Sequence, residues 1–348
     1  MIFLHTSLFS DVANVSYTLN QIIAEGARGV QLFYIISALT LFLSFYQRSS
    51  LEKYPVRNFY LRRIFRIAPM FYLSIIIYLF IYGLGPRYWL GDCPQITASN
   101  VFANFTFLHG INPYWINSIV PGGWSIAVEM MFYVIFPLLF KKVNTLNQAF
   151  AFFNISLIIR FVFQLVLTSS TDKFNHGLWH EYLFLYFPGQ LPLFAIGILL
   201  YFKLFKESGA DELPKGKNLL LFALLCSIQL LVPSTEIFSK HILFGVLFYF
   251  VILGISKYNT ILLNNVFTRF VGKISFSMYL VHFAVLEFLK KLHFTELSSN
   301  SLFSYIISLI MNLTITITIS FITFKLIEEP CLFICKKWIQ KVEGKLTY

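Results

Sequence analysis

Residues 58–69 read Asn-Phe-Tyr-Leu-Arg-Arg-Ile-Phe-Arg-Ile-Ala-Pro, a basic segment with apolar sequence on both sides. The flanking runs, 29–46 and 67–85, contain no charged residue. Each run is close to the ~20 apolar residues that a helix needs to cross a bilayer. The basic segment is therefore expected at a membrane surface, where one spanning helix is followed by the next.

The arginines of this segment are candidates for binding an anion. Arg63 and Arg66 are three residues apart, so on a helix they share one face, and Arg62 adjoins them. Two guanidinium forks on one face suit a phosphate group, and a cytoplasmic position would turn them toward soluble phosphorylated cofactors. The alternative is that the cluster only orients the protein, because Lys and Arg gather on cytoplasmic loops for that reason alone.

The composition is that of an integral membrane protein. Of the 348 residues, 57% are hydrophobic and 12% are charged, whereas soluble domains have about 25% charged residues. The net charge of +11 does not indicate nucleic-acid binding, because the basic residues collect in short loops between apolar runs. Membrane lipid is therefore an expected partner and nucleic acid is not.

The apolar runs predict an all-α, polytopic membrane protein of about ten transmembrane helices, organised as a single domain over 1–348. The first helix is expected to be truncated, because residues 1–10 are mostly apolar but too few to span. The short run 98–110 is expected to be re-entrant or interfacial. The full spans are predicted at 29–46, 67–85, 124–140, 148–168, 182–202, 218–233, 241–256, 272–289 and 303–327.

The basic residues predict how the chain is oriented. With the 47–66 loop inside, 20 Lys and Arg residues fall on the inner side and 6 on the outer side, and Arg160 falls within a span. An excess of Lys and Arg marks cytoplasmic loops. The loops at 47–66, 141–147, 203–217 and 257–271, and the C-terminal tail, are therefore predicted to be cytoplasmic.

Two ionisable residues in the spans stand out as candidates for chemistry, since such groups are costly at membrane depth. His5 lies in the outer half of the first helix, and histidine is suited to proton transfer near neutral pH. The alternative is a histidine that only packs the helix. Glu129 lies in the outer half of its span, and the alternative for it is a structural pair with Arg160.

Several sequence blocks together resemble those of the acyltransferase 3 family of integral membrane acyltransferases. They occur in the family's order and cover essentially the whole chain. Where the family usually has Asp, Gly and a second acid, this chain has Gln31, Ala38 and Met130, and it begins too late for the family's N-terminal basic residue. The matching blocks are His5, 29–38, the Arg-x-x-Arg of Arg63 and Arg66, Trp124 to Tyr133, Gly272 to His282, and the closing Glu-x-Pro from Glu328 to Pro330.

The resemblance implies an acyltransferase of the bacterial inner membrane, similar to the O-acetyltransferases of surface polysaccharides. The donor would be an acyl-coenzyme A, with acetyl the most common acyl group, and the acceptor a hydroxyl of a cell-surface glycan or its lipid-linked precursor. His5 and Glu129 would be catalytic, and Arg62, Arg63 and Arg66 would bind the coenzyme. The remaining motif residues are Ser37, Trp124, Ser125, Tyr279, His282 and Glu328, with His282 expected to be a structural hydrogen-bonding residue.

Two other readings remain. A transporter or flippase would also have about ten spans, buried charges and basic inner loops, but it would move its substrate without chemistry; the motifs and the lack of visible twofold repeats argue against it. The second alternative is a member of the family that has no activity, because the N-terminal basic residue is missing. No metal is expected, because the four cysteines and the pair His176 and His180 lack a complete ligand pattern.

Overall fold

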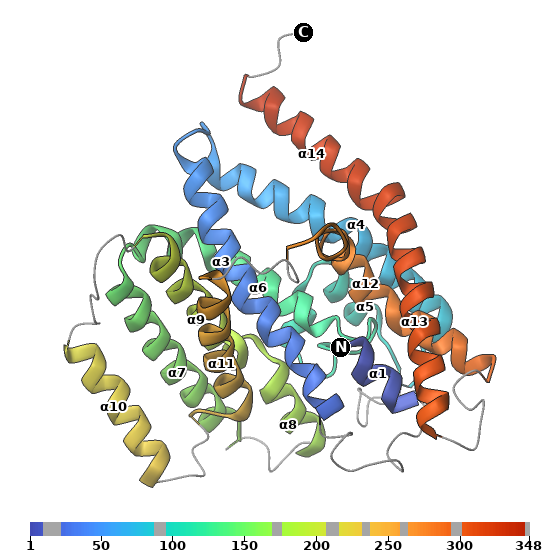
Figure 1. The fold of residues 1–348 in the computed structure, drawn as a ribbon, viewed down its shortest axis with the longest axis horizontal. Helices are drawn as coiled ribbons and strands as arrows, with labels where there is room; N and C mark the ends of the chain where they lie inside the picture. The colour runs from blue at the N-terminus through green and yellow to red at the C-terminus, as the bar shows by residue number, and fades with distance from the viewer. Residues whose placement is uncertain are drawn as a thin grey trace.

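A computed structural model describes residues 1–9, 22–86, 95–168, 176–206, 216–231, 237–257, 264–293 and 301–344, and the regular elements within these ranges are helices (Figure 1). Elements η2 and η4 are 3₁₀ turns, and η7 is a π turn. The elements are α1 (Ile2–Phe9), η2 (Glu25–Arg28), α3 (Gly29–Ser49), α4 (Pro55–Tyr82), α5 (Ala98–Phe105), η4 (Leu108–Ile111), α6 (Trp124–Lys142), α7 (Leu146–Thr168), α8 (His176–Leu185), α9 (Phe187–Phe205), α10 (Gly216–Leu231), α11 (Lys240–Ser256), α12 (Val266–Lys291), α13 (Ser301–Thr323), η7 (Phe324–Glu328) and α14 (Glu329–Val342).

The all-α, polytopic membrane class predicted from the sequence is confirmed. Within the described ranges, seven helical stretches are long and apolar enough to cross a bilayer. The predicted spans at 218–233 and 241–256 correspond to the shorter apolar helices α10 and α11. The described part of the first helix, α1, has eight residues.

Helix α9 is the centre of one half of the bundle, packed between α3 and α7 (Figure 1). Every residue from Gly189 to Phe202 is buried, which fits a helix that is apolar on all sides. The approach to α3 is so close that a side chain at Gly197 would place its Cβ 2.2 Å from the carbonyl oxygen of Ile35. A small residue at this crossing lets the two backbones pack against each other, as in many membrane helix pairs.

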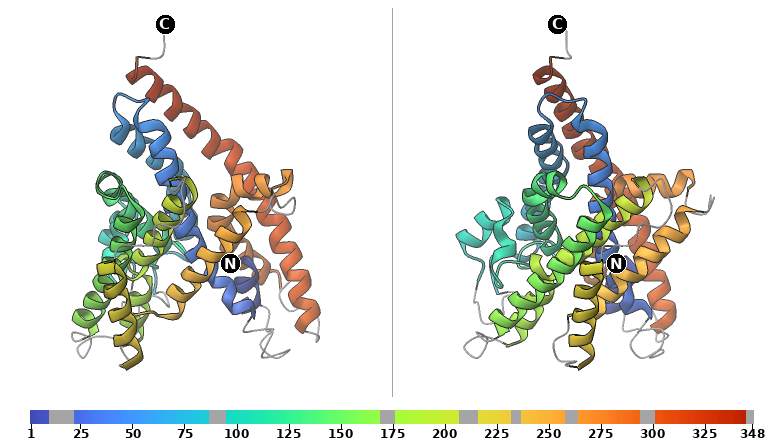
Figure 2. Two further views of the ribbon diagram at one scale, coloured as in Figure 1. Left: turned by 60° about the vertical axis from the view of Figure 1, so that its left-hand side comes forward. Right: turned by 90° about the vertical axis from the view of Figure 1, so that its left-hand side faces the viewer.

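The other half of the bundle is built on α12 and α13, with α1 packed against both. A π turn, η7, joins α13 to α14, so the predicted C-terminal tail begins as a helix that continues out of the membrane span. Helix α14 packs along α4 and projects with the α3–α4 turn at one end of the molecule (Figure 2).

The predicted loop over 47–66 is wrong, because most of it is helical. Helix α3 runs on to Ser49 and α4 begins at Pro55, a residue that favours the first position of a helix. Helix α4 has 28 residues and so is ~42 Å long, more than the ~30 Å hydrocarbon core requires. The last arginine of the basic segment shows where the apolar sequence begins. The helix itself begins earlier, at Pro55, and includes the charged residues. Of the predicted loop at 203–217, residues 207–215 lie outside the described residues. Of the predicted loop at 257–271, residues 258–263 lie outside them, and α12 already begins at Val266.

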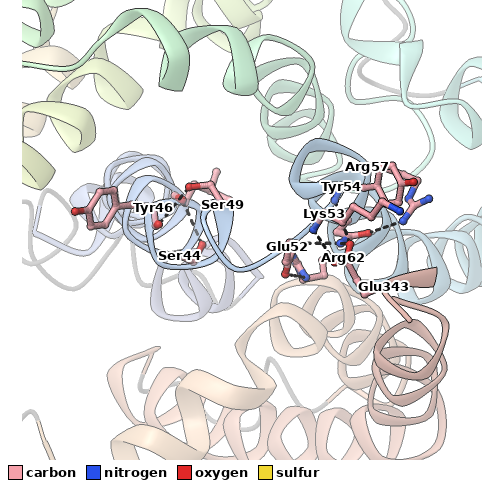
Figure 3. Close-up of polar contacts among 11 residues, drawn as sticks. Ser44, Tyr46, Ser49, Glu52, Lys53, Tyr54, Arg57, Arg62 and Glu343 are labelled. Atoms are coloured by element: carbon pink, nitrogen blue, oxygen red, sulfur yellow. Dashed lines mark hydrogen bonds and ion pairs between the residues drawn. The ribbon is translucent and has the colours of Figure 1, made fainter. Parts of the chain in front are cut away.

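The start of α4 is held by a carboxylate from the far end of the chain (Figure 3). Tyr54 precedes the helix without a side-chain cap of its own. Glu343, just after α14, accepts hydrogen bonds from the backbone N–H groups of Lys53 and Tyr54, at 2.7 and 3.1 Å, and from Asn58 Nδ2 at 2.7 Å. A carboxylate is favoured at a helix N-terminus, where backbone N–H groups and the helix dipole both attract it.

This contact predicts a loss of stability in Glu343→Ala. We expect the variant to lose about 1–2 kcal/mol of unfolding free energy, as for a lost helix cap, and so to unfold at lower temperature in detergent. Glu329→Ala is the matched control. Its ion pairs with Lys273 and Lys325 are exposed, and such pairs contribute about 0–1 kcal/mol. Equal midpoints for Glu343→Ala and the wild type would show that α14 does not hold α4.

Candidate active site

A cavity of about 350 Å³ lies among helices α3, α4, α6 and α12. Its wall brings together side chains that are far apart in the sequence, including six of those predicted as site residues. These six are Ser37, Arg63, Arg66, Ser125, Glu129 and Tyr279. The predicted Arg62, Trp124, His5, His282 and Glu328 are not among its lining residues.

Glu129 presents a buried carboxylate to this cavity, with only 4% of the residue exposed. Its Oε1 accepts a hydrogen bond from Ser37 Oγ at 2.8 Å and another from the hydroxyl of Tyr133. Tyr133 is four residues after Glu129 on α6, so the two share a face. The alternative pairing with Arg160 is not formed, since Arg160 lies on α7 and its Nη1 donates to the carbonyl of Ile237. Hydrogen bonds therefore compensate for the burial of this carboxyl group.

Arg63 and Arg66 line the same cavity, as their shared helix face predicts. Both are half-buried, and within the described residues neither forms an ion pair. The guanidinium carbon of Arg63 lies 5.8 Å from the ring centroids of Phe59 and Tyr133, and its Nε is buried without a hydrogen-bond partner. Two cations and a single carboxylate, in a cavity of low dielectric, leave an excess of positive charge that attracts a negatively charged ligand.

Arg62 belongs to a different environment from its two neighbours. Its guanidinium forms an ion pair with Glu52, in which Nη1 and Nη2 lie 2.7–2.9 Å from the carboxylate oxygens. Figure 3 shows this pair beside the carboxylate of Glu343, at the α3–α4 turn. A position one residue from Arg63 points about 100° away around the helix. Arg62 thus stabilises the turn and does not line the cavity.

A compact group of hydroxyls forms another part of the wall. The hydroxyls of Ser125 and Tyr279 lie 2.9 Å apart, and the carbonyl oxygen of Gly122 lies 2.9 Å from each. Gly122 has φ = 78°, and a Cβ there would lie 2.7 Å from the Tyr279 hydroxyl, so glycine is required. Trp124 packs outside the cavity, with its ring 6.2 Å from that of Tyr34.

His5 lies beside α12 rather than beside Glu129. Its ring centroid is 5.3 Å from that of His282 and 4.2 Å from that of Phe283. Glu129 is instead held by Ser37 and Tyr133, and within the described residues it forms no hydrogen bond with His5. A contact between residues 5 and 282 leaves no local pattern in the sequence. The position of His5 beside His282 was therefore not predicted from the sequence.

Glu328 is held in the interior between α12 and the π turn. It is 1% exposed, and its Oε1 accepts a hydrogen bond from Ser277 on α12. Its role in the described structure is to join the end of α13 to α12. Tyr133 is the cavity residue that sequence reasoning missed, although its position one turn after Glu129 is a signal that could have identified it.

A metal centre is not formed by the described parts of the chain. No group of three or more His, Cys, Asp or Glu side chains there could hold a metal ion. The polar side-chain groups that line the cavity are guanidinium groups, hydroxyls and a carboxylate. Such a set can bind an anion, orient an acyl group and exchange protons, which are the requirements of group transfer.

Comparison with known proteins identifies relatives of this chain. Three curated relatives from Staphylococcus aureus strains COL, MSSA476 and MRSA252 each carry the name "Putative O-acetyltransferase". Each is 22% identical over 347 residues, a region that covers 91% of this chain and 54% of the relative. The chain thus spans about half the length of the curated relatives it matches. No solved structure matches it.

A family match covers most of the chain. Residues 1–323 match the family described as "Acyltransferase domain", acyltransferase 3. This region includes the cavity, both histidines of the α1–α12 contact and all the helices from α3 to α13. The chain therefore belongs to the acyltransferase 3 family of membrane acyltransferases.

Proposed function

We propose that this protein moves an acyl group, most simply acetyl, from acyl-coenzyme A to a hydroxyl of a cell-surface glycan or its lipid-linked precursor. We also propose that residues 1–348 form one domain in the inner membrane of a bacterium. The observation that carries the proposal is the cavity in which Arg63 and Arg66, without ion-pair partners in the described residues, face a buried Glu129. The names of the relatives agree with acyl transfer to oxygen.

Coenzyme A fits the electrostatics of the cavity. Its phosphates carry negative charge, and guanidinium forks bind phosphate through charge-assisted hydrogen bonds. Membrane burial strengthens such contacts, since water does not compete for the donors. The half-buried Arg63 and Arg66 are positioned for this role, whereas Arg62 is engaged by Glu52.

The helix positions suggest how the cofactor would be oriented. Arg63 lies eight residues after Pro55, so it is ~12 Å along α4 from its basic end. Glu129 lies thirteen residues before Lys142, or ~20 Å from the basic end of α6. With these basic ends in the cytoplasm, phosphates at the arginines would place the thioester deeper, toward Glu129. The acyl group could then reach an acceptor on the other side while the cofactor stays inside.

Transfer to a sugar hydroxyl needs a base. As the hydroxyl oxygen bonds to the thioester carbonyl carbon, its proton must leave, and the C–S bond then breaks to release coenzyme A as a thiol. His5 is the proposed base, and a positioned base contributes about 10²–10⁴ in rate. Glu129, Tyr133 and Tyr279 supply hydrogen-bonding groups in the cavity wall that could orient the acyl group. A transporter would need no such arrangement and would leave coenzyme A unconsumed.

The proposed function and orientation can be tested together in membrane vesicles. Labelled acetyl-coenzyme A, which does not cross a bilayer, is added to inside-out and right-side-out vesicles from cells with and without the gene. We expect gene-dependent label in the glycan fraction, together with free thiol, from inside-out vesicles only. Gene-dependent label from right-side-out vesicles alone would reverse the orientation. The absence of gene-dependent transfer from both would contradict the function.

A second prediction concerns the two cavity arginines. Arg63→Ala and Arg66→Ala should each weaken acetyl-coenzyme A binding about 10- to 100-fold, because a hydrogen bond to a charged group contributes roughly 1.5–3 kcal/mol. Lysine should restore the affinity only in part, since it lacks the planar fork. Calorimetry on the purified protein measures the change.

Arg57→Ala is the matched control for these variants. Arg57 is exposed on the same helix, so its loss removes the same charge without changing the cavity. Its affinity should stay near that of the wild type. If all three alanine variants bind equally well, the arginines serve only to orient the protein.

A further inference from the structure

Two histidines that are far apart in the sequence pack together at the edge of the site. The ring of His5, on α1, and the ring of His282, on α12, have centroids 5.3 Å apart and planes inclined by 38°. The ring of Phe283 lies against both, at 4.2 and 4.3 Å. His282 is fully buried, with 0% of the residue exposed. Ionisable side chains at such depth are costly and tend to mark function.

The hydrogen bonding of His282 determines which of its nitrogens can act as a base. Its Nδ1 lies 3.1 Å from the carbonyl oxygen of Met278, and a carbonyl oxygen can only accept. In the neutral ring, Nδ1 therefore carries the hydrogen and Nε2 carries the lone pair. That Nε2 is buried, and within the described residues it has no hydrogen-bond partner.

The same holds for the Nε2 of His5, which is also buried and lacks a partner in the described part of the chain. Leaving a buried polar atom unpaired costs roughly 1–3 kcal/mol. Two such atoms on adjacent rings are therefore unexpected in a region that serves packing alone. A hydroxyl or a shared proton between the rings would satisfy them.

A hydroxyl from α4 braces the turn that carries His282. The hydroxyl of Tyr78 donates to the carbonyl of Leu280 at 2.8 Å and accepts from the backbone N–H of Ala284 at 3.1 Å. These two backbone groups enclose the helical turn with His282 at its middle. Tyr78 is itself 1% exposed. Helix α4, which carries Arg63 and Arg66, thus holds the backbone turn that bears His282, while Met278 on α12 binds the imidazole itself.

The histidine pair adjoins the cavity at two points. Met1 and Tyr279 both line the cavity. Met1 is one turn before His5, whose backbone N–H bonds to the Met1 carbonyl at 3.0 Å. Tyr279 is one turn before His282, and the two rings are 6.0 Å apart. The pair therefore lies at the edge of the proposed acyl-transfer site, one helical turn from two of its lining residues.

We infer that His5 and His282 act as one proton-handling unit, an inference that rests on the proposed function. As the acceptor oxygen bonds to the acyl carbon, its proton passes to Nε2 of His5. The lone pair on Nε2 of His282 then accepts a hydrogen bond from the charged ring and stabilises it. The proton finally goes to the departing sulfur, so that coenzyme A leaves as a thiol. His282 acts through His5 and is therefore a positioning residue.

Asparagine at position 282 separates this role from a structural one. An Asn amide can replace Nδ1–H as the donor to Met278, but it offers no lone pair at the place of Nε2. We expect His282→Asn to lower acetyl transfer in inside-out vesicles about 10²-fold or more, with acetyl-coenzyme A affinity unchanged. His282→Gln, which also lacks a basic nitrogen, is the second variant in case Asn impairs insertion. Near wild-type transfer by either inserted variant would overturn the inference.

The double variant tests whether the histidines act together. If they form one unit, His5→Gln with His282→Asn should transfer no more slowly than His5→Gln alone, because groups acting as a unit are not additive. Losses that multiply would show independent roles and overturn the inference. A wild type that transfers no label would instead contradict the proposed function, which separates the two failures.

His241→Asn is the matched control for loss of a buried histidine. His241 lies on α11, and both its ring nitrogens have partners, Nδ1 with Ser239 Oγ at 2.9 Å and Nε2 with the Gly189 carbonyl at 3.1 Å. It does not line the cavity. For the amount of protein inserted, this variant should transfer at close to the wild-type rate. An equal loss in His241→Asn and His282→Asn would assign the effect to packing and contradict the inference.

Discussion

The constraint on which the site depends is the positive charge of two guanidinium groups that share one membrane cavity and form no salt bridge within the described residues. Arg63 and Arg66 line the cavity opposite Glu129, yet the carboxylate is committed to Ser37 and Tyr133 rather than to them. Two positive side chains against one carboxylate leave an excess of positive charge in the cavity. As arranged, it retains an unmet positive charge, and an anionic ligand meets it best.

The rest of the fold keeps those arginines at a fixed depth. Helix α4 begins at Pro55 and extends beyond the membrane core, so the two side chains project from a continuous helix rather than from a loop. Glu343 caps its start, and Arg62 binds Glu52 beside it. Further along, Tyr78 ties α4 to α12. One helix, α4, therefore connects the basic end, the cavity and the turn that carries His282.

Hydropathy predicted most of the helices, because each spanning segment must bury its backbone hydrogen bonds in a helix and expose apolar side chains to lipid. Spacing also predicted that Arg63 and Arg66 share a face. The prediction of a loop over 47–66 was wrong, because a helix can continue past the membrane surface into charged sequence. The role of Arg62 was missed for a related reason, as its partner Glu52 lies across a turn that the pattern did not reveal.

Long-range packing decided the remainder of the site. The contact between His5 and His282 depends on how α1 docks on α12, and the bonds of Glu129 depend on the crossing of α3 and α6. Neither is encoded in local periodicity. The resemblance to the family identified which residues matter, including Ser125 and Tyr279, but not which of them touch.

A cryo-electron microscopy structure with a non-hydrolysable acetyl-coenzyme A analogue tests the central claim most directly. The account predicts phosphate density in contact with Arg63 and Arg66, and the acyl end deeper in the cavity, toward Glu129 and Tyr279. An empty cavity with the analogue bound elsewhere, or phosphates at the opposite end with the acyl group beside the arginines, would contradict it.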